Sequence, residues 1–90
     1  MAFESVPAVI REISRLLIQA EKATDTVERG AAIRQLWKIH SQLRSEVMQV
    51  ERDIRDGQNR RVEAVVFRAA LATLSVELAL MGEEEPGLAS

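Results

Sequence analysis

The chain has 90 residues, a formal charge of −2 and no cysteine. This length fits one small domain, and the lack of cysteine excludes disulfides, thiolate metal sites and cysteine nucleophiles. Hydrophobic residues make up 47% of the sequence but aromatic residues only 3%. Because alanine, leucine, glutamate and arginine favour helix over strand, we expect an all-α protein.

No apolar run approaches the roughly 20 residues that a membrane-spanning helix requires. Charged residues interrupt the N-terminal stretch where a signal peptide has a continuous apolar core. The sequence therefore predicts a cytoplasmic protein with no membrane contact. Neither sign of charge dominates, so the composition alone indicates no nucleic-acid partner.

The first expected helix spans about residues 6–23. Ser5 is a suitable N-cap, and Pro7 is tolerated in the first turn because its missing N–H would have no helical partner there. Apolar residues recur at steps of four and three, which is the spacing of one helix face. This seam comprises Val6, Ile10, Ile13, Leu17 and Ala20.

The second helix is expected over residues 26–56. Asp25 followed by Glu28 forms a capping-box pattern, with Thr24 and Thr26 as competing caps. Gly57 can adopt the left-handed conformation that ends a helix. The first half has a broad apolar sector, made of Ala32, Ile33, Leu36, Trp37, Ile39 and His40. The second half has a narrow seam, made of Leu43, Val47, Val50 and Ile54. Since a broad sector contacts two neighbours and a narrow seam one, the first helix should cover only the first half.

The third helix, expected over residues 59–81, is apolar on two sides. One side is bulky and comprises Ala64, Phe67, Leu71, Leu74, Leu78 and Met81. The other comprises Val62, Val65, Val66, Ala69, Ala72, Val76, Ala79 and Leu80. A monomer would expose one of these sides near the start of the helix, and a long exposed apolar strip marks an interaction site. Residues 83–90 are expected to form an acidic flexible tail.

The predicted fold is an all-α, three-helix, up-down-up chain with a long central helix, in which residues 1–82 form a single domain. The two-sided third helix indicates a helical-bundle or coiled-coil homodimer, because two-fold dimers are the commonest closed assembly. The expected interface comprises Val47, Val50, Ile54, Val62, Val65, Val66, Ala69, Ala72 and Val76. We assign the bulky side of the third helix to the core of the chain, and the reverse assignment stays open.

His40 is the only histidine and interrupts the apolar sector of the second helix. We interpret it as a structural residue with a satisfied hydrogen bond. The alternative is a pH-sensitive contact at an interface, because the unperturbed pKa of histidine is about 6.5. A metal site is disfavoured, since the Glu-x-x-His pattern of helical di-metal proteins would place a carboxylate where Trp37 stands.

Six residues are candidates for contact with a partner. Trp37 and His40 lie together, and tryptophan is over-represented at binding hot spots, although a solitary tryptophan also fits an ordinary core position. The other four candidates are the basic residues Arg11, Arg15, Arg34 and Lys38. If these converge with Lys22, the five charges can bind a nucleic-acid backbone weakly.

The sequence contains no recognisable catalytic set, neither a Ser/His/Asp order nor a glycine-rich phosphate loop. We therefore expect a small non-enzymatic protein, of the kind found among bacterial and phage regulators, without cofactor or metal. It would act through protein–protein interaction, as an adaptor, inhibitor or regulatory subunit, and would self-associate. A nucleic-acid-binding accessory protein is the first alternative, and a small helical-bundle enzyme is the second.

Overall fold

The computed structural model describes residues 6–83. Over that range the chain forms α1 (Val6–Lys22), α2 (Thr26–Arg55) and α3 (Arg61–Leu80), with no strand. The all-α prediction is therefore confirmed for this part of the chain. The proposed Ser5 cap, the side chain of Val6 and most of the acidic tail lie outside the described residues.

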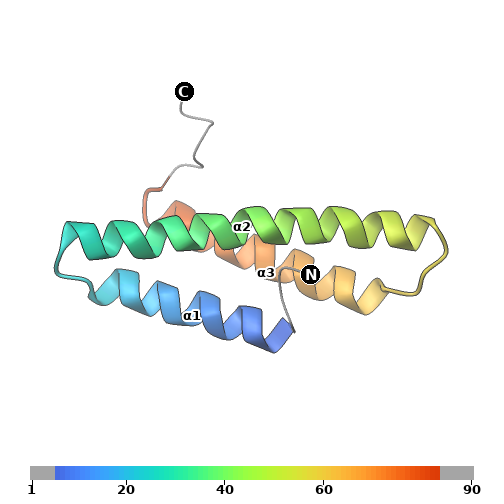
Figure 1. The fold of residues 1–90 in the computed structure, drawn as a ribbon, viewed down its shortest axis with the longest axis horizontal. Coiled ribbons are helices and arrows are strands. Elements are labelled where there is room, and N and C mark those ends of the chain that lie inside the picture. The colour runs from blue at the N-terminus through green and yellow to red at the C-terminus, as the bar shows by residue number, and fades with distance from the viewer. Residues whose placement is uncertain (1–5, 84–90) are drawn as a thin grey trace, which may run out of the picture.

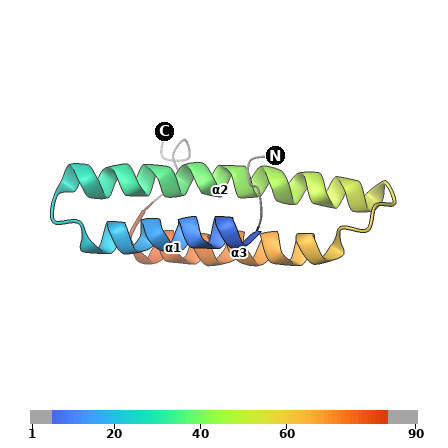
Figure 2. The ribbon, with the colours of Figure 1, turned by 60° about the horizontal axis from the view of Figure 1, so that its bottom comes forward.

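α2 is the longest element, and the other two helices lie along the same side of it (Figures 1 and 2). The two connections lie at opposite ends of α2 (Figure 1). α2 packs closely on both α1 and α3, whereas α1 and α3 contact each other much less. α2 therefore holds the two shorter helices in place, and the seam between those two is loosely closed.

The helix ends follow local signals in the sequence. The carboxylate of Asp25 accepts a hydrogen bond of 2.9 Å from the backbone N–H of Val27 and so caps α2. Gly57 follows α2 with φ of +95°, and Gly82 follows α3 with φ of +77°. In both places the backbone hydrogen bonds are those of a Schellman motif. These positions favour glycine because other L-residues are strained at positive φ.

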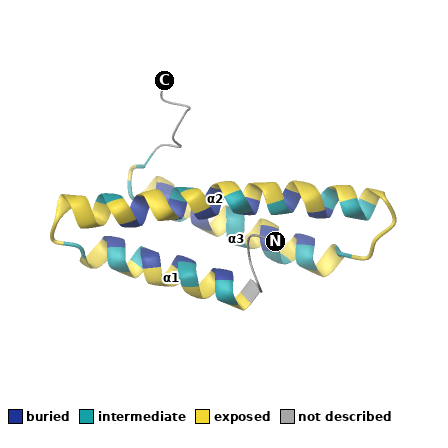
Figure 3. Cartoon of the chain, viewed as in Figure 1, coloured by how far each residue is buried: buried dark blue, intermediate teal, exposed yellow. Residues whose placement is uncertain are grey.

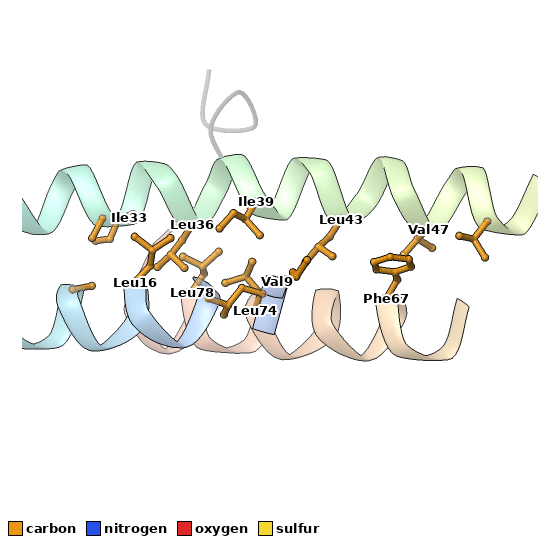
Figure 4. Packing of buried hydrophobic residues seen from close by; sticks show 14 of the residues in the cluster. Val9, Leu16, Ile33, Leu36, Ile39, Leu43, Val47, Phe67, Leu74 and Leu78 are labelled. Carbon is orange, nitrogen blue, oxygen red and sulfur yellow. The ribbon is translucent and has the colours of Figure 1, made fainter. Parts of the chain in front are cut away.

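The core is a continuous row of apolar side chains between α2 and the two shorter helices (Figure 4), and buried positions recur along each of the three helices (Figure 3). The most deeply buried large side chains are Leu36, Leu43, Val50, Leu74 and Leu78. Figure 4 shows Leu16 of α1 near Leu36, and Phe67 of α3 beneath Val47. The first half of α2 therefore packs on both neighbours, while its second half packs on α3.

The buried face of α1 is rotated relative to the predicted seam. Ile13 and Ala20 are buried as the seam requires, but Ile10 is 48% exposed and Leu17 is only half-buried. In their place Val9 and Leu16 enter the core. The reason is that α1 carries two overlapping apolar seams, one residue apart, and only one of them can face α2.

Candidate protein interaction surface

An apolar groove lies between α1 and α3. Its volume is about 380 Å³. Its lining residues are Ile10, Ile13, Ser14 and Leu17 of α1 and Val65, Val66, Ala69, Ala70, Thr73 and Glu77 of α3. The groove opens to solvent where Ile10 and Val65 are exposed. It exists because α1 and α3 are both held by α2 yet make few contacts with each other.

An exposed apolar strip of α3 continues the groove. We call it the α3 face, and it comprises Val62, Val65, Ala69, Ala72, Val76 and Leu80. Its three valines and its leucine are between 57% and 78% exposed. At 3.6 residues per turn the six positions fall within about 80° of the helix circumference. The spacing from Val62 to Val76 alternates between three and four residues, as in a coiled-coil seam.

The groove and the α3 face together form one surface, which we call the α1/α3 surface. Among the residues that line the groove, Glu77 is the charged one. Two of the three arginines near the start of α3, Arg60 and Arg68, are paired with residues outside this surface. Arg68 lies 3.3 Å from Glu51 of α2, and Arg60 forms ion pairs with Asp53 and Glu63. The surface therefore remains apolar across most of its width.

The Arg60 cluster fixes the turn between α2 and α3. The hydrogen bond from Arg60 lowers the pKa of Asp53, and a second hydrogen bond from Gln49 acts in the same direction. The hydrogen bonds to Glu63 and Asp53 raise the pKa of Arg60 above its ordinary value. All of these contacts lie within the chain, so the cluster has a structural explanation without a bound anion.

The structure separates the predicted interface residues into three groups. Those on α3 lie on the α3 face or, like the half-buried Val66, line the groove. Ile54 is half-buried and borders a separate hollow with Glu51 and Arg68. Val47 and Val50 are buried in the core of the single chain. These two are therefore not members of an exposed surface, because α3 already covers the narrow seam of α2.

Sequence reasoning missed the contribution of α1 to this surface. Ile10 and Leu17 were expected in the core but line the groove, and Ile18 is 51% exposed. Leu80 extends the α3 face and was not among the predicted interface residues. The available signal was the width of the apolar arc on α1, which exceeds what one neighbouring helix can cover.

His40 is buried and joins α2 to α3. Its Nε2 lies 2.8 Å from Oγ of Ser75, and the Ser75 hydroxyl donates to the carbonyl oxygen of Leu71, also at 2.8 Å. A hydroxyl has one hydrogen, so both bonds form together only when His40 Nε2 carries a proton and donates it to Ser75. A catalytic Ser–His pair has the opposite polarity, with serine donating to histidine. This pair links α2 to α3.

Trp37 packs against His40 on the other flank of α3 from the groove. Their ring centroids are 5.2 Å apart and the planes meet at 67°, an edge-to-face arrangement. The two rings border a hollow of about 370 Å³ that also includes Arg44, Ser75 and Glu83. The burial of His40 leaves Trp37 as the more accessible of the two predicted contact residues.

The four basic candidates are all exposed, and none of them lines the groove. Arg15 donates hydrogen bonds to Glu12 and to Gln19 on its own helix. The hydrogen bond with Glu12 raises the pKa of Arg15 and lowers that of Glu12. The contacts of Arg15 therefore run along α1 and do not draw it towards Arg34 or Lys38 on α2.

Across residues 6–83, no group of three or more His, Cys, Asp or Glu side chains is placed to hold a metal ion. None of the helices in that range has the length and apolar character needed to span a membrane. Comparison of the chain with protein-family models, with curated proteins and with solved structures gives no match.

Proposed function

We propose that this chain is a small non-enzymatic protein that acts through protein–protein interaction, as an adaptor, inhibitor or regulatory subunit, with the α1/α3 surface as its docking site. The supporting observation is that Val62, Val65, Val76 and Leu80 are each more than half exposed beside an apolar groove. Contiguous exposed apolar patches mark interaction sites in soluble proteins. An amphipathic helix is the natural occupant, because its apolar face can lie in a groove between two helices.

Self-association is part of this proposal. In it, two up-down-up chains pack their α1/α3 surfaces together as a helical-bundle homodimer. The α3 face supports this arrangement because it has coiled-coil spacing and few charges. A two-fold dimer uses the same patch on both copies, so one exposed surface per chain is sufficient.

The experiment is a light-scattering measurement of molar mass over a range of protein concentrations. We expect the mass of the wild-type chain to rise from 10.1 kDa towards twice that value. Val65→Glu should stay monomeric, because the new carboxylate would have to be buried without a partner. Ser45→Glu is the matched control, since it adds the same charge at an exposed position of α2 outside the groove.

Both altered positions are exposed in the single chain, so we expect both variants to keep their helices. Circular dichroism checks this. Self-association of Val65→Glu equal to that of the wild type would contradict the assignment of this surface. A wild-type chain that stays at the monomer mass throughout would contradict self-association itself.

A further inference from the structure

We infer that the α3 face packs on the α3 face of a second copy, with the two helices antiparallel about a two-fold axis that passes beside Ala69 and Ala72. This inference rests on the proposed self-association and adds the orientation and the residues that meet. Three features of the α1/α3 surface support it: the order of side-chain sizes along α3, the order of charges along α3, and the area available.

The centre of the α3 face allows two helices to approach closely. Ala69 and Ala72 are exposed, and the larger Val65 and Val76 lie on either side of them. A two-fold axis midway between Ala69 and Ala72 brings Val65 of each copy opposite Val76 of the other, because both lie equally far from that midpoint. Alanine then meets alanine at the centre, and the valines fill the space beyond.

The charges along α3 favour the antiparallel orientation. Arg60 and Arg68 are paired with carboxylates of their own chain, so Arg61 is the basic residue that the start of α3 offers, whereas the C-terminal end carries Glu77 and Glu83. Antiparallel packing therefore places the basic end of each α3 beside the acidic end of the other. Parallel packing would bring like charges together at both ends. The helix dipoles act in the same direction, since antiparallel helices pair opposite partial charges.

The surface also has the size that a second copy needs. α3 has 20 residues and is therefore about 30 Å long. The α1/α3 surface is two helices wide, and each helix is roughly 10 Å across. This surface therefore covers about 600 Å² on one copy. A dimer would bury about 1,200 Å² in total, which is the lower end of the range for specific interfaces. The expected dimer is one that dissociates on dilution.

Disulfide trapping tests the orientation directly, since the natural sequence has no cysteine to interfere. A Val65→Cys chain is mixed with a mass-tagged Val76→Cys chain. We expect the mixed disulfide between them to form several-fold more than the disulfide between two Ser45→Cys chains. Val65→Cys alone should stay at the Ser45→Cys level. In the antiparallel dimer, its two copies would lie about 16 Å apart along the helix axis at 1.5 Å per residue. A disulfide tolerates a Cα separation of only about 7 Å.

The possible results distinguish the antiparallel orientation from self-association itself. Efficient trapping of Val65→Cys with itself would show parallel helices, and would overturn the inference while leaving self-association in place. A dimer that gives no mixed disulfide between the two positions would also overturn the inference alone. Sedimentation of the reduced variants shows whether each still dimerises, and a chain that is monomeric at every concentration would overturn both proposals.

Discussion

Nε2 of His40 lies 2.8 Å from Oγ of Ser75, in a partly buried contact between residues that are 35 positions apart in the sequence. The hydrogen bond ties the middle of α2 to α3 and passes on through Ser75 to the carbonyl oxygen of Leu71. His40 is only 6% exposed, and Ser75 is a hydrogen-bond partner of its Nε2. We therefore expect the free energy of unfolding to fall when one partner of this hydrogen bond is removed and the other stays.

We expect Ser75→Ala to lower the free energy of unfolding by about 1–3 kcal/mol, the cost of leaving a buried polar group unsatisfied. The double variant His40→Leu/Ser75→Ala should lose less, because replacing both partners with apolar groups removes the unsatisfied donor. Urea unfolding followed by circular dichroism measures both values. His40→Leu alone should keep the fold, and its failure to fold would show that the hydrogen bond is indispensable.

Burial separates two leucines on α3. Leu74 is fully buried and Leu80 is exposed. Leu74→Ala should therefore cost about 2–5 kcal/mol of unfolding free energy, through lost transfer energy and a cavity. Leu80→Ala should change the stability of the monomer by less than about 0.5 kcal/mol. Urea titrations at a concentration below that of self-association test this pair, and equal losses would contradict the placement of the two faces of α3.

The Asp53–Arg60 contact predicts a dependence of stability on pH. The hydrogen bond from Arg60 lowers the pKa of Asp53 in the folded chain, so the ionised carboxylate stabilises the fold at pH values above the ordinary pKa of about 3.9. This contribution is lost as the pH falls below about 3.9 and through the lowered pKa of the folded state. Thermal unfolding is measured from neutral to acid pH. Asp53→Asn should lose less stability on acidification than the wild type does.

Arg60→Gln provides the control for that measurement, because it removes the same interaction from the other partner. The effects of the two substitutions should not add in the double variant Asp53→Asn/Arg60→Gln. Additive effects, or an unchanged acid-side slope in Asp53→Asn, would show that this contact does not contribute to the pH dependence.

Two glycines of the chain should respond oppositely to alanine. Gly30 lies inside α2, and a Cβ there would meet only the end of the Arg34 side chain, at 3.5 Å. Gly30→Ala should stabilise the chain by roughly 0.5–1 kcal/mol through its higher helix propensity. Gly57 has open space around it but a φ of +95°. Gly57→Ala should destabilise by about 1–2 kcal/mol, because an L-residue is strained there. Thermal unfolding of both variants checks the signs.

The sequence predicted those features that depend on local chemistry. Asp25 and Gly57 mark the ends of α2 as expected, because a cap and a positive φ each need particular residue types. The start of α3 at Arg61 was less evident, since the capping position is occupied by Arg60, whose side chain makes no capping bond. A boundary without a chemical signal can be placed only to within a few residues.

Features that depend on packing were harder to predict. The apolar residues of α1 allow either Val9 and Leu16 or Ile10 and Leu17 to face inward, and only the angle of approach to α2 decides between them. The burial of Val47 and Val50 also depends on packing between helices, because α3 covers both residues within the chain. The partner of His40 could not be named either, because nothing local to the helix identifies a serine 35 positions away.

We propose that this protein meets its partner at the α1/α3 surface, and that a second copy of the chain is the first such partner. An NMR dilution series on the uniformly labelled chain tests this proposal most directly, because it reports both association and its location. We predict concentration-dependent amide shifts along the α3 face and around Ile10 and Leu17, with Ser45 on α2 unaffected. A spectrum that does not change with concentration, or shifts centred on Trp37 and His40, would contradict the account.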